Sequence, residues 1–187
     1  LVNAQVAPDL PGSAAHVQAE VENTGQPRDF RLAYVLREAQ SGTVVVSGET
    51  DPLSIVANET KTIDFRIPVS NARLWSPEDP FLYELELSTG ADTLKTRFGM
   101  RSFSFDVNTG RAVLNGKPYF MRGTNVCIYR FFEDAARGGL PWNQEWARKL
   151  HEKFKGMHWN SIRYCIGFPP EFWYDIADEL GILIQDE

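Results

Sequence analysis

Five residues in the last third of the chain have side chains that could do chemistry: Arg163, Asn125, Asp186, Glu187 and Trp142. The planar guanidinium of Arg163 can hold a carboxylate in place with two parallel hydrogen bonds. The amide, the two carboxylates and the indole ring could bind a polar ligand. Each also has a simpler explanation: a structural ion pair for Arg163, a turn for Asn125, structural carboxylates for Asp186 and Glu187, and a place in the core for Trp142.

The elements expected around these residues alternate between strand and helix. Apolar side chains recur at intervals of three and four over residues 142–157, which predicts an amphipathic helix. Residues 160–166 are predicted to form a strand. A second helix is expected to start at Pro169-Pro170 and to end at Gly181, and residues 182–184 form an apolar strand. Apolar strands joined by helices predict parallel pairing.

The first part of the chain has a different pattern. From about residue 14 to 105, apolar and polar residues alternate in short runs that are separated by Gly, Pro, Asn and Asp. Six or seven such runs predict an antiparallel sandwich of the immunoglobulin-like kind. We expect few exposed aromatic residues in the strand pattern of this sandwich apart from Trp75. Beyond residue 106, Asn115-Gly116 predicts a hairpin turn.

Composition limits the class of protein. A chain of 187 residues that is 43% hydrophobic and 24% charged can bury a core, and its net charge of −6 argues against a nucleic-acid partner. No apolar run approaches the roughly 20 residues that span a membrane. No signal peptide is visible in this sequence, but the parent protein could still be exported to the medium or to a bacterial periplasm, because a signal peptide is removed from the mature protein. Cys127 and Cys165 lack metal-ligand spacing, so we expect two buried thiols and no metal or cofactor.

Several motifs resemble those of family 2 glycoside hydrolases, which include β-galactosidases, β-glucuronidases and β-mannosidases. They are W-S-P-E-D-P-F-L-Y over residues 75–83, F-G-M-R over 98–101, L-N-G-K-P-Y-F-M-R-G-T-N over 114–125, N-S-I-R over 160–163, and F-W-Y-D-I-A-D-E-L-G-I-L-I-Q-D-E over 172–187. The resemblance implies an immunoglobulin-like β-sandwich over residues 1–105. Residues 106–187 would then form the first three strands and two helices of a truncated (β/α)8 barrel.

The resemblance also implies an activity for a longer parent protein. That protein would be a retaining exo-β-glycosidase acting on a carbohydrate substrate, with two catalytic glutamates on later barrel strands, downstream of Glu187. We therefore expect this chain to be a fragment that is inactive alone. The alternative is a non-catalytic carbohydrate-binding or scaffold module. A homo-oligomer is compatible with either.

Barrel enzymes place their working groups at the carboxyl ends of the strands. In the family the arginine that matches Arg163 hydrogen-bonds the nucleophilic glutamate. By their expected positions at the strand ends and in the loop that follows the first strand, Asn125, Asp186, Glu187 and Trp142 could contact or position the sugar. Two departures concern substrate contacts. The family's Ser-His-Tyr-Pro is replaced here by the residues from Cys165 to Phe168, and the His-Glu pair that often follows R-G-x-N is replaced by Cys127-Ile128. The identity of the sugar therefore stays open.

Overall fold

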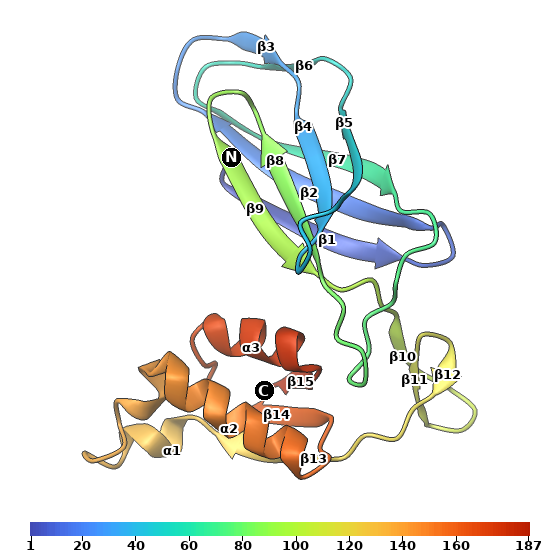
Figure 1. Cartoon of the computed structure of the whole chain (residues 1–187). Helices are drawn as coiled ribbons and strands as arrows, with labels where there is room; N and C mark the ends of the chain where they lie inside the picture. Colours follow the sequence, from blue (N-terminus) through green and yellow to red (C-terminus); the bar gives the residue numbers. More distant parts are fainter. The chain divides into compact units, whose positions relative to one another are not determined.

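The computed structural model describes residues 1–187, which divide into two compact units. The first unit consists of Leu1–Leu74 and Phe81–Ser102, and the second consists of Trp75–Pro80 and Phe103–Glu187. The segment Trp75–Pro80 therefore belongs to the second unit although both of its neighbours in the chain belong to the first. Figure 1 shows the elements of each unit.

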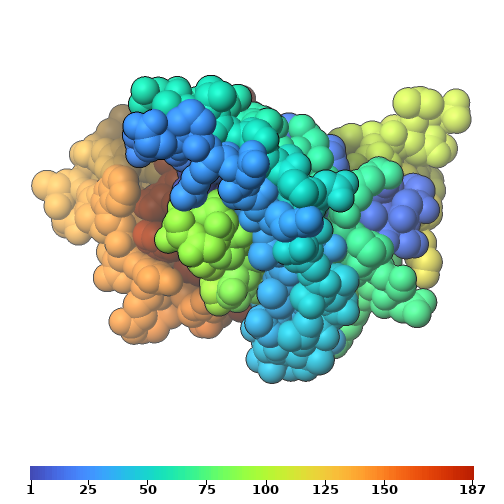
Figure 2. All heavy atoms as spheres, turned by 90° about the horizontal axis from the view of Figure 1, so that it is seen from above, coloured from blue at the N-terminus to red at the C-terminus, as the bar shows by residue number.

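The first unit is an antiparallel sandwich. One sheet has the order β1 (Asn3–Asp9), β2 (Ala14–Asn23), β7 (Glu59–Pro68), and the other has the order β5 (Val44–Glu49), β4 (Ala33–Glu38), β8 (Tyr83–Ser88), β9 (Thr93–Phe98). A short ribbon pairs β3 (Arg28–Phe30) with β6 (Leu53–Ile55). The space-filling view shows green residues of the β8–β9 hairpin beside blue residues of the N-terminal strands (Figure 2).

The alternation in the sequence produces this sandwich, because every second side chain of a strand faces the opposite sheet. Val17 and Ala19 of β2 are fully buried in one core cluster together with Leu36 of β4 and Leu85 of β8. Tyr83, at the start of β8, accepts a hydrogen bond from the Arg73 backbone N–H at 2.8 Å, much as a tyrosine corner does in immunoglobulin-like domains.

The second unit begins with a small antiparallel sheet of β10 (Phe103–Phe105), β11 (Ala112–Leu114) and β12 (Lys117–Pro118). The predicted turn between β11 and β12 is confirmed. Asn115 and Gly116 both have positive φ, of 51° and 76°, as a type I′ hairpin turn requires.

The rest of the second unit is a parallel sheet with helices between its strands. Its strands are β13 (Gly123–Cys127), β14 (Ser161–Cys165) and β15 (Leu183–Asp186), in that order and all parallel, which confirms the predicted pairing. Between β13 and β14 come α1 (Tyr129–Phe132), the 3-10 turn η1 (Leu140–Trp142) and α2 (Gln144–Gly156), and α3 (Phe172–Leu180) precedes β15. No helix of the chain has the length and hydrophobicity needed to cross a membrane.

The helix expected over residues 142–157 is shorter than predicted. The Asn143 side chain caps α2 by accepting the Trp146 backbone N–H at 2.9 Å, so the helix starts at Gln144. Trp142 is 66% exposed and Met157 is 50% exposed, so neither contributes to the core. The core lies between α2, α3 and one face of the sheet, and includes Phe154 and Trp173.

Candidate functional site

The predicted polar residues gather on one face of the parallel sheet. Asn125, Arg163 and Gln185 are register partners across β13, β14 and β15. Their neighbours Val126 and Tyr164 point the other way and are buried in the core beneath the helices. We call the face that carries Asn125, Cys127, Arg163, Cys165, Gln185 and Glu187 the helix-free face.

Arg163 occupies the centre of this face, on the middle strand. Its Nη2 forms an ion pair with Glu187 Oε2, and the two side chains are 35% and 51% exposed. Its Nε is buried without a hydrogen-bond partner. Because a guanidinium has five N–H donors, Arg163 can bind a further acceptor while it still holds Glu187.

Asn125 and Glu187 lie on the same face as Arg163, as the prediction requires, and both are exposed. Asp186 lies on the opposite face. It pairs in register with Tyr164, and its Oδ1 accepts the Tyr174 hydroxyl of α3 at 2.9 Å. Burial and the nearby Asp186 carboxylate raise the pKa of Tyr174, so its hydroxyl stays a donor at neutral pH. The structure thus separates Asp186 from Arg163.

Trp142 lies in η1, in the connection that follows β13. The indole Nε1 of the buried Trp173 donates a hydrogen bond to the Pro141 carbonyl at 2.8 Å, which anchors this turn to α3. The ring of Trp142 is exposed although the turn that carries it is fixed. Our explanation of Trp142 as a core residue is therefore wrong, and its role as a stacking surface stays a prediction.

The segment Trp75–Pro80 contacts the carboxyl ends of α2 and α3. Trp75 is fully buried, so the expectation that it would be exposed is wrong. Its Nε1 donates to the Asp178 carbonyl of α3 at 2.8 Å, and its own carbonyl accepts the Asn115 side-chain N–H at 3.0 Å. Lys155 of α2 donates to the carbonyls of Pro77 and Gly181, at 2.7 and 3.0 Å.

Asn160 completes this network at the start of β14. It is 3% exposed; its Oδ1 accepts the Arg122 backbone N–H at 2.7 Å, and its Nδ2 donates to the Tyr119 hydroxyl at 2.9 Å and the Phe120 carbonyl at 3.0 Å. Tyr119 in turn donates to Glu78 at 2.8 Å. Burial and the Glu78 carboxylate raise the pKa of Tyr119, and burial lowers the pKa of Lys155. Together these contacts fix where the parallel strands start.

Comparison with known proteins places the chain in a family. The family model for glycosyl hydrolases family 2 matches residues 1–101, more than half of the chain. The chain belongs to glycosyl hydrolase family 2. A candidate β-glucuronidase of Formosa agariphila is 38% identical over 159 residues, and a β-galactosidase of Lactococcus lactis is 32% identical over 136 residues.

These relatives are much longer proteins. The chain is matched over 81% and 69% of its own length but spans only 18% and 13% of the two relatives. A family 2 structure from Bacteroides cellulosilyticus matches 98% of the chain with a TM-score of 0.84, 20% identity and 26% of its own length covered. β-Glucuronidase 2 of Bacteroides uniformis matches 98% of the chain with a TM-score of 0.79, 24% identity and 22% covered. At these identities the structures support the fold alone.

Two features of this family 2 chain were not anticipated. His151 is fully buried between α2 and the sheet, with Nδ1 2.8 Å from the Ala147 carbonyl and Nε2 2.5 Å from the Tyr164 hydroxyl. Because Nδ1 must donate to a carbonyl, Nε2 of the neutral ring accepts the Tyr164 hydroxyl proton. Burial lowers the pKa of His151 and raises that of Tyr164, so both stay neutral.

The second unanticipated feature is that Cys127 and Cys165 lie together on the helix-free face, with their sulfur atoms 3.0 Å apart. Only Cys165 is fully buried, so the prediction of two buried thiols is wrong for Cys127. The predicted parallel pairing makes these strands neighbours, but no pattern in the sequence indicated that the two cysteines would be register partners.

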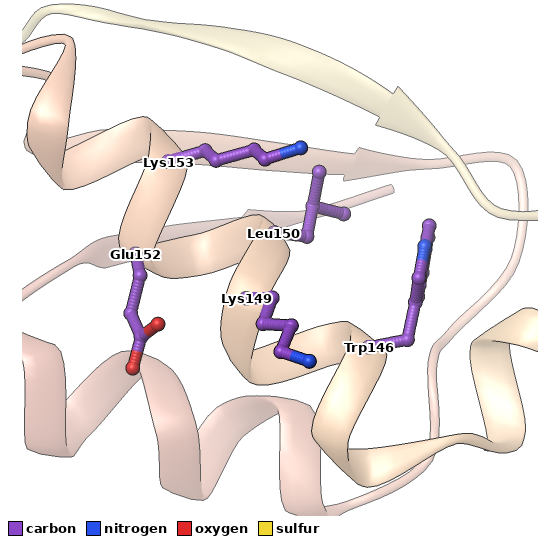
Figure 3. Close-up of a pocket in the computed structure, with 5 residues that line it drawn as sticks. All are labelled: Trp146, Lys149, Leu150, Glu152 and Lys153. Atoms are coloured by element: carbon purple, nitrogen blue, oxygen red, sulfur yellow. The ribbon is translucent and has the colours of Figure 1, made fainter.

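A hollow of about 430 Å³ lies along α2 and is lined by Trp146, Lys149, Leu150, Glu152 and Lys153 (Figure 3). Its lining includes none of the residues of the helix-free face, so we do not assign it to the candidate site. No group of three or more His, Cys, Asp and Glu side chains is arranged to hold a metal ion.

Proposed function

We propose that the chain is part of a retaining β-glycosidase and that its parallel sheet opens the catalytic barrel of that enzyme. Family membership and three parallel strands with crossover helices support this, because a (β/α)8 barrel is built from eight such strand–helix units. In this proposal the sandwich domain spans residues 1–105 and the incomplete barrel spans residues 106–187. The substrate would be a β-linked carbohydrate, as for the relatives named β-galactosidase and β-glucuronidase.

The position and contacts of Arg163 are the observation that carries the proposal. It lies on the middle strand, near the carboxyl end where barrel enzymes place their working groups, and it already holds one carboxylate. Its buried Nε, which lacks a partner, could bind a second carboxylate. We assign this place to the nucleophilic glutamate of the parent protein, which Arg163 would keep ionised and oriented.

The other residues take smaller roles in this proposal. Asn125 and Glu187 flank Arg163 on the helix-free face and would line the sugar site. Trp142 would offer its exposed ring for stacking against the sugar. Asp186, which binds Tyr174 on the other face, would position α3 against β15 instead of contacting substrate. The buried state of Trp75 disfavours the alternative of a sugar-binding sandwich, because it removes the aromatic residue that was named as exposed in the sandwich.

The 187-residue chain itself is proposed to be inactive, since the catalytic pair would come from strands downstream of Glu187. A retaining mechanism needs two carboxyl groups about 5–5.5 Å apart, and one must be free to attack the sugar. Glu187 is the one carboxylate among the residues of the helix-free face, and Asp186 accepts the Tyr174 hydroxyl on the other face.

The test is hydrolysis of nitrophenyl β-glucuronide, β-galactoside and β-mannoside by the parent protein and by this chain. We expect turnover by the parent only. In the parent, Arg163→Lys should lower kcat about 100-fold with little change in KM, as when one electrostatic contact in a transition state is lost. Arg66→Lys, an exposed arginine of the sandwich, is the matched control. Turnover by the 187-residue chain, or a parent unaffected by Arg163→Lys, would contradict the proposal.

A further inference from the structure

Cys127 and Cys165 form a close pair of free thiols at the carboxyl ends of two neighbouring strands. Their sulfur atoms are 3.0 Å apart, and the two residues are register partners in the parallel ladder of β13 and β14. They are 38 residues apart in the chain, so the fold brings them together.

The backbone around the pair suits a covalent bond between them. Neighbouring strands lie about 4.7–4.9 Å apart, and disulfides usually join Cα atoms that are about 4.4–6.8 Å apart. Both side chains point to the helix-free face, because each lies two residues beyond a residue of that face, Asn125 in one strand and Arg163 in the other. A bond between the sulfurs therefore requires no change of register and no reversal of a side chain.

We propose that Cys127 and Cys165 are a redox-active dithiol, which a small-molecule disulfide converts into an intramolecular disulfide between β13 and β14. This proposal does not rest on the proposed glycosidase function. It assigns a modification site to the face that carries Arg163. The oxidised and reduced chains would differ in whether the ends of two strands are covalently joined.

The two thiols have different parts in the reaction. Cys127 is partly exposed and Cys165 is 4% exposed, so Cys127 meets the oxidant first. Its thiolate attacks one sulfur of the small disulfide, forms a mixed disulfide and releases one small thiol. Cys165 then loses its proton and attacks the Cys127 sulfur, which releases the second small thiol. Two cysteine thiols are oxidised by two electrons, and one small disulfide is reduced to two thiols.

The charges around the pair fit this order. The hydrogen bond with Cys127 and burial raise the pKa of Cys165, so that thiol stays protonated until its partner has reacted. Arg163 lowers that pKa and Glu187 raises it, so the groups of the candidate site also act on the thiol. The attack of Cys165 on the mixed disulfide should be fast, because its sulfur atom is already in contact with the sulfur of Cys127.

The experiment exposes the complete 187-residue chain, folded and without denaturant, to oxidised glutathione. Intact mass and peptide mapping then measure the products. We expect loss of two hydrogen masses, a cross-linked peptide pair containing Cys127 and Cys165, and no accumulation of the glutathione adduct. In Cys165→Ser the adduct at Cys127 should persist. The same chain in urea should close the bond at least about tenfold more slowly, because the thiols then meet only through a flexible loop.

Three outcomes would overturn the proposal. One is two free thiols in the folded wild-type chain after the unfolded chain has oxidised. Another is a stable glutathione adduct on Cys127 of the wild type, and the third is a disulfide between two chains. The main result comes from the wild-type chain, so it does not depend on whether a serine variant folds. Cys127→Ser provides a second check, since its remaining buried thiol should react more slowly than Cys127 does in Cys165→Ser.

Discussion

Gly181→Ala tests whether Trp75–Pro80 is packed as tightly against the second unit as the structure shows. Gly181 ends α3 in the left-handed conformation, with φ of 73° and ψ of 62°. A Cβ atom there would lie 2.5 Å from the Pro77 carbonyl oxygen and 2.8 Å from the Pro77 Cα. Both contacts are with backbone, which cannot rotate away as a side chain can. The substitution therefore combines backbone strain with a steric clash.

The size of the effect follows from these two causes. A left-handed conformation costs a residue with a Cβ atom about 1–2 kcal/mol. Displacing well-packed neighbours costs about 1–3 kcal/mol more. We expect Gly181→Ala to lower the free energy of unfolding by about 2–5 kcal/mol. Gly110→Ala is the matched control, because Gly110 has a similar φ of 67° and a Cβ atom there would meet nothing within 4 Å. The control should cost only about 1–2 kcal/mol.

The tryptophans make the measurement specific. All five belong to the second unit: Trp75, Trp142, Trp146, Trp159 and Trp173. Urea unfolding followed by tryptophan fluorescence therefore reports on that unit, and the difference between the two variants isolates the clash with Pro77. Equal losses of stability in Gly181→Ala and Gly110→Ala would refute the packing described here.

Three further predictions concern the second unit. Asn160→Ala should lower the unfolding free energy of the second unit by about 1–3 kcal/mol, because the Arg122 N–H and the Phe120 carbonyl lose their partner. The control Asn108→Ala, in an exposed turn, should change this free energy little. Trp75→Phe keeps an aromatic ring but removes the indole N–H that donates to the Asp178 carbonyl, and should lower the free energy of unfolding by about 1–3 kcal/mol in the same urea assay. Burial depresses the pKa of folded His151 below its unfolded value of about 6.5, so stability should be full above that pH and fall as the pH drops towards the folded pKa. In His151→Gln this part of the pH dependence should disappear, and an unchanged slope would count against a buried neutral histidine.

The elements that could be predicted from the sequence are those fixed by local chemistry. Alternating residues in β2 and β7, the Asn115-Gly116 turn and the Gly181 cap each depend on neighbours a few residues away. The start of α2 was misplaced by two residues, because aromatic spacing extended the helix past its Asn143 cap. Helix caps are stronger evidence for a boundary than an apolar stripe that continues into the preceding turn.

The features that could not be predicted depend on contacts between distant residues. The burial of Trp75 depends on Asp178, 103 residues further along the chain. The pairing of Cys127 with Cys165 and the separation of Asp186 from Arg163 both depend on the register of the parallel strands. A shift of one residue reverses which face a side chain occupies, and the sequence places strand ends less accurately than that.

The two ends of the parallel sheet have different parts in the structure. Trp75, Asn115 and Asn160, which lie within the motifs shared with family 2, hold the starts of the strands through long-range hydrogen bonds. Replacing any of them should lower the stability of the second unit. The departures from the family's sequence, at Cys127 and from Cys165 onward, lie at the other end of the strands, beside Arg163. A change there leaves the framework intact and alters what the helix-free face can bind, so under the proposed function these residues would set the substrate preference.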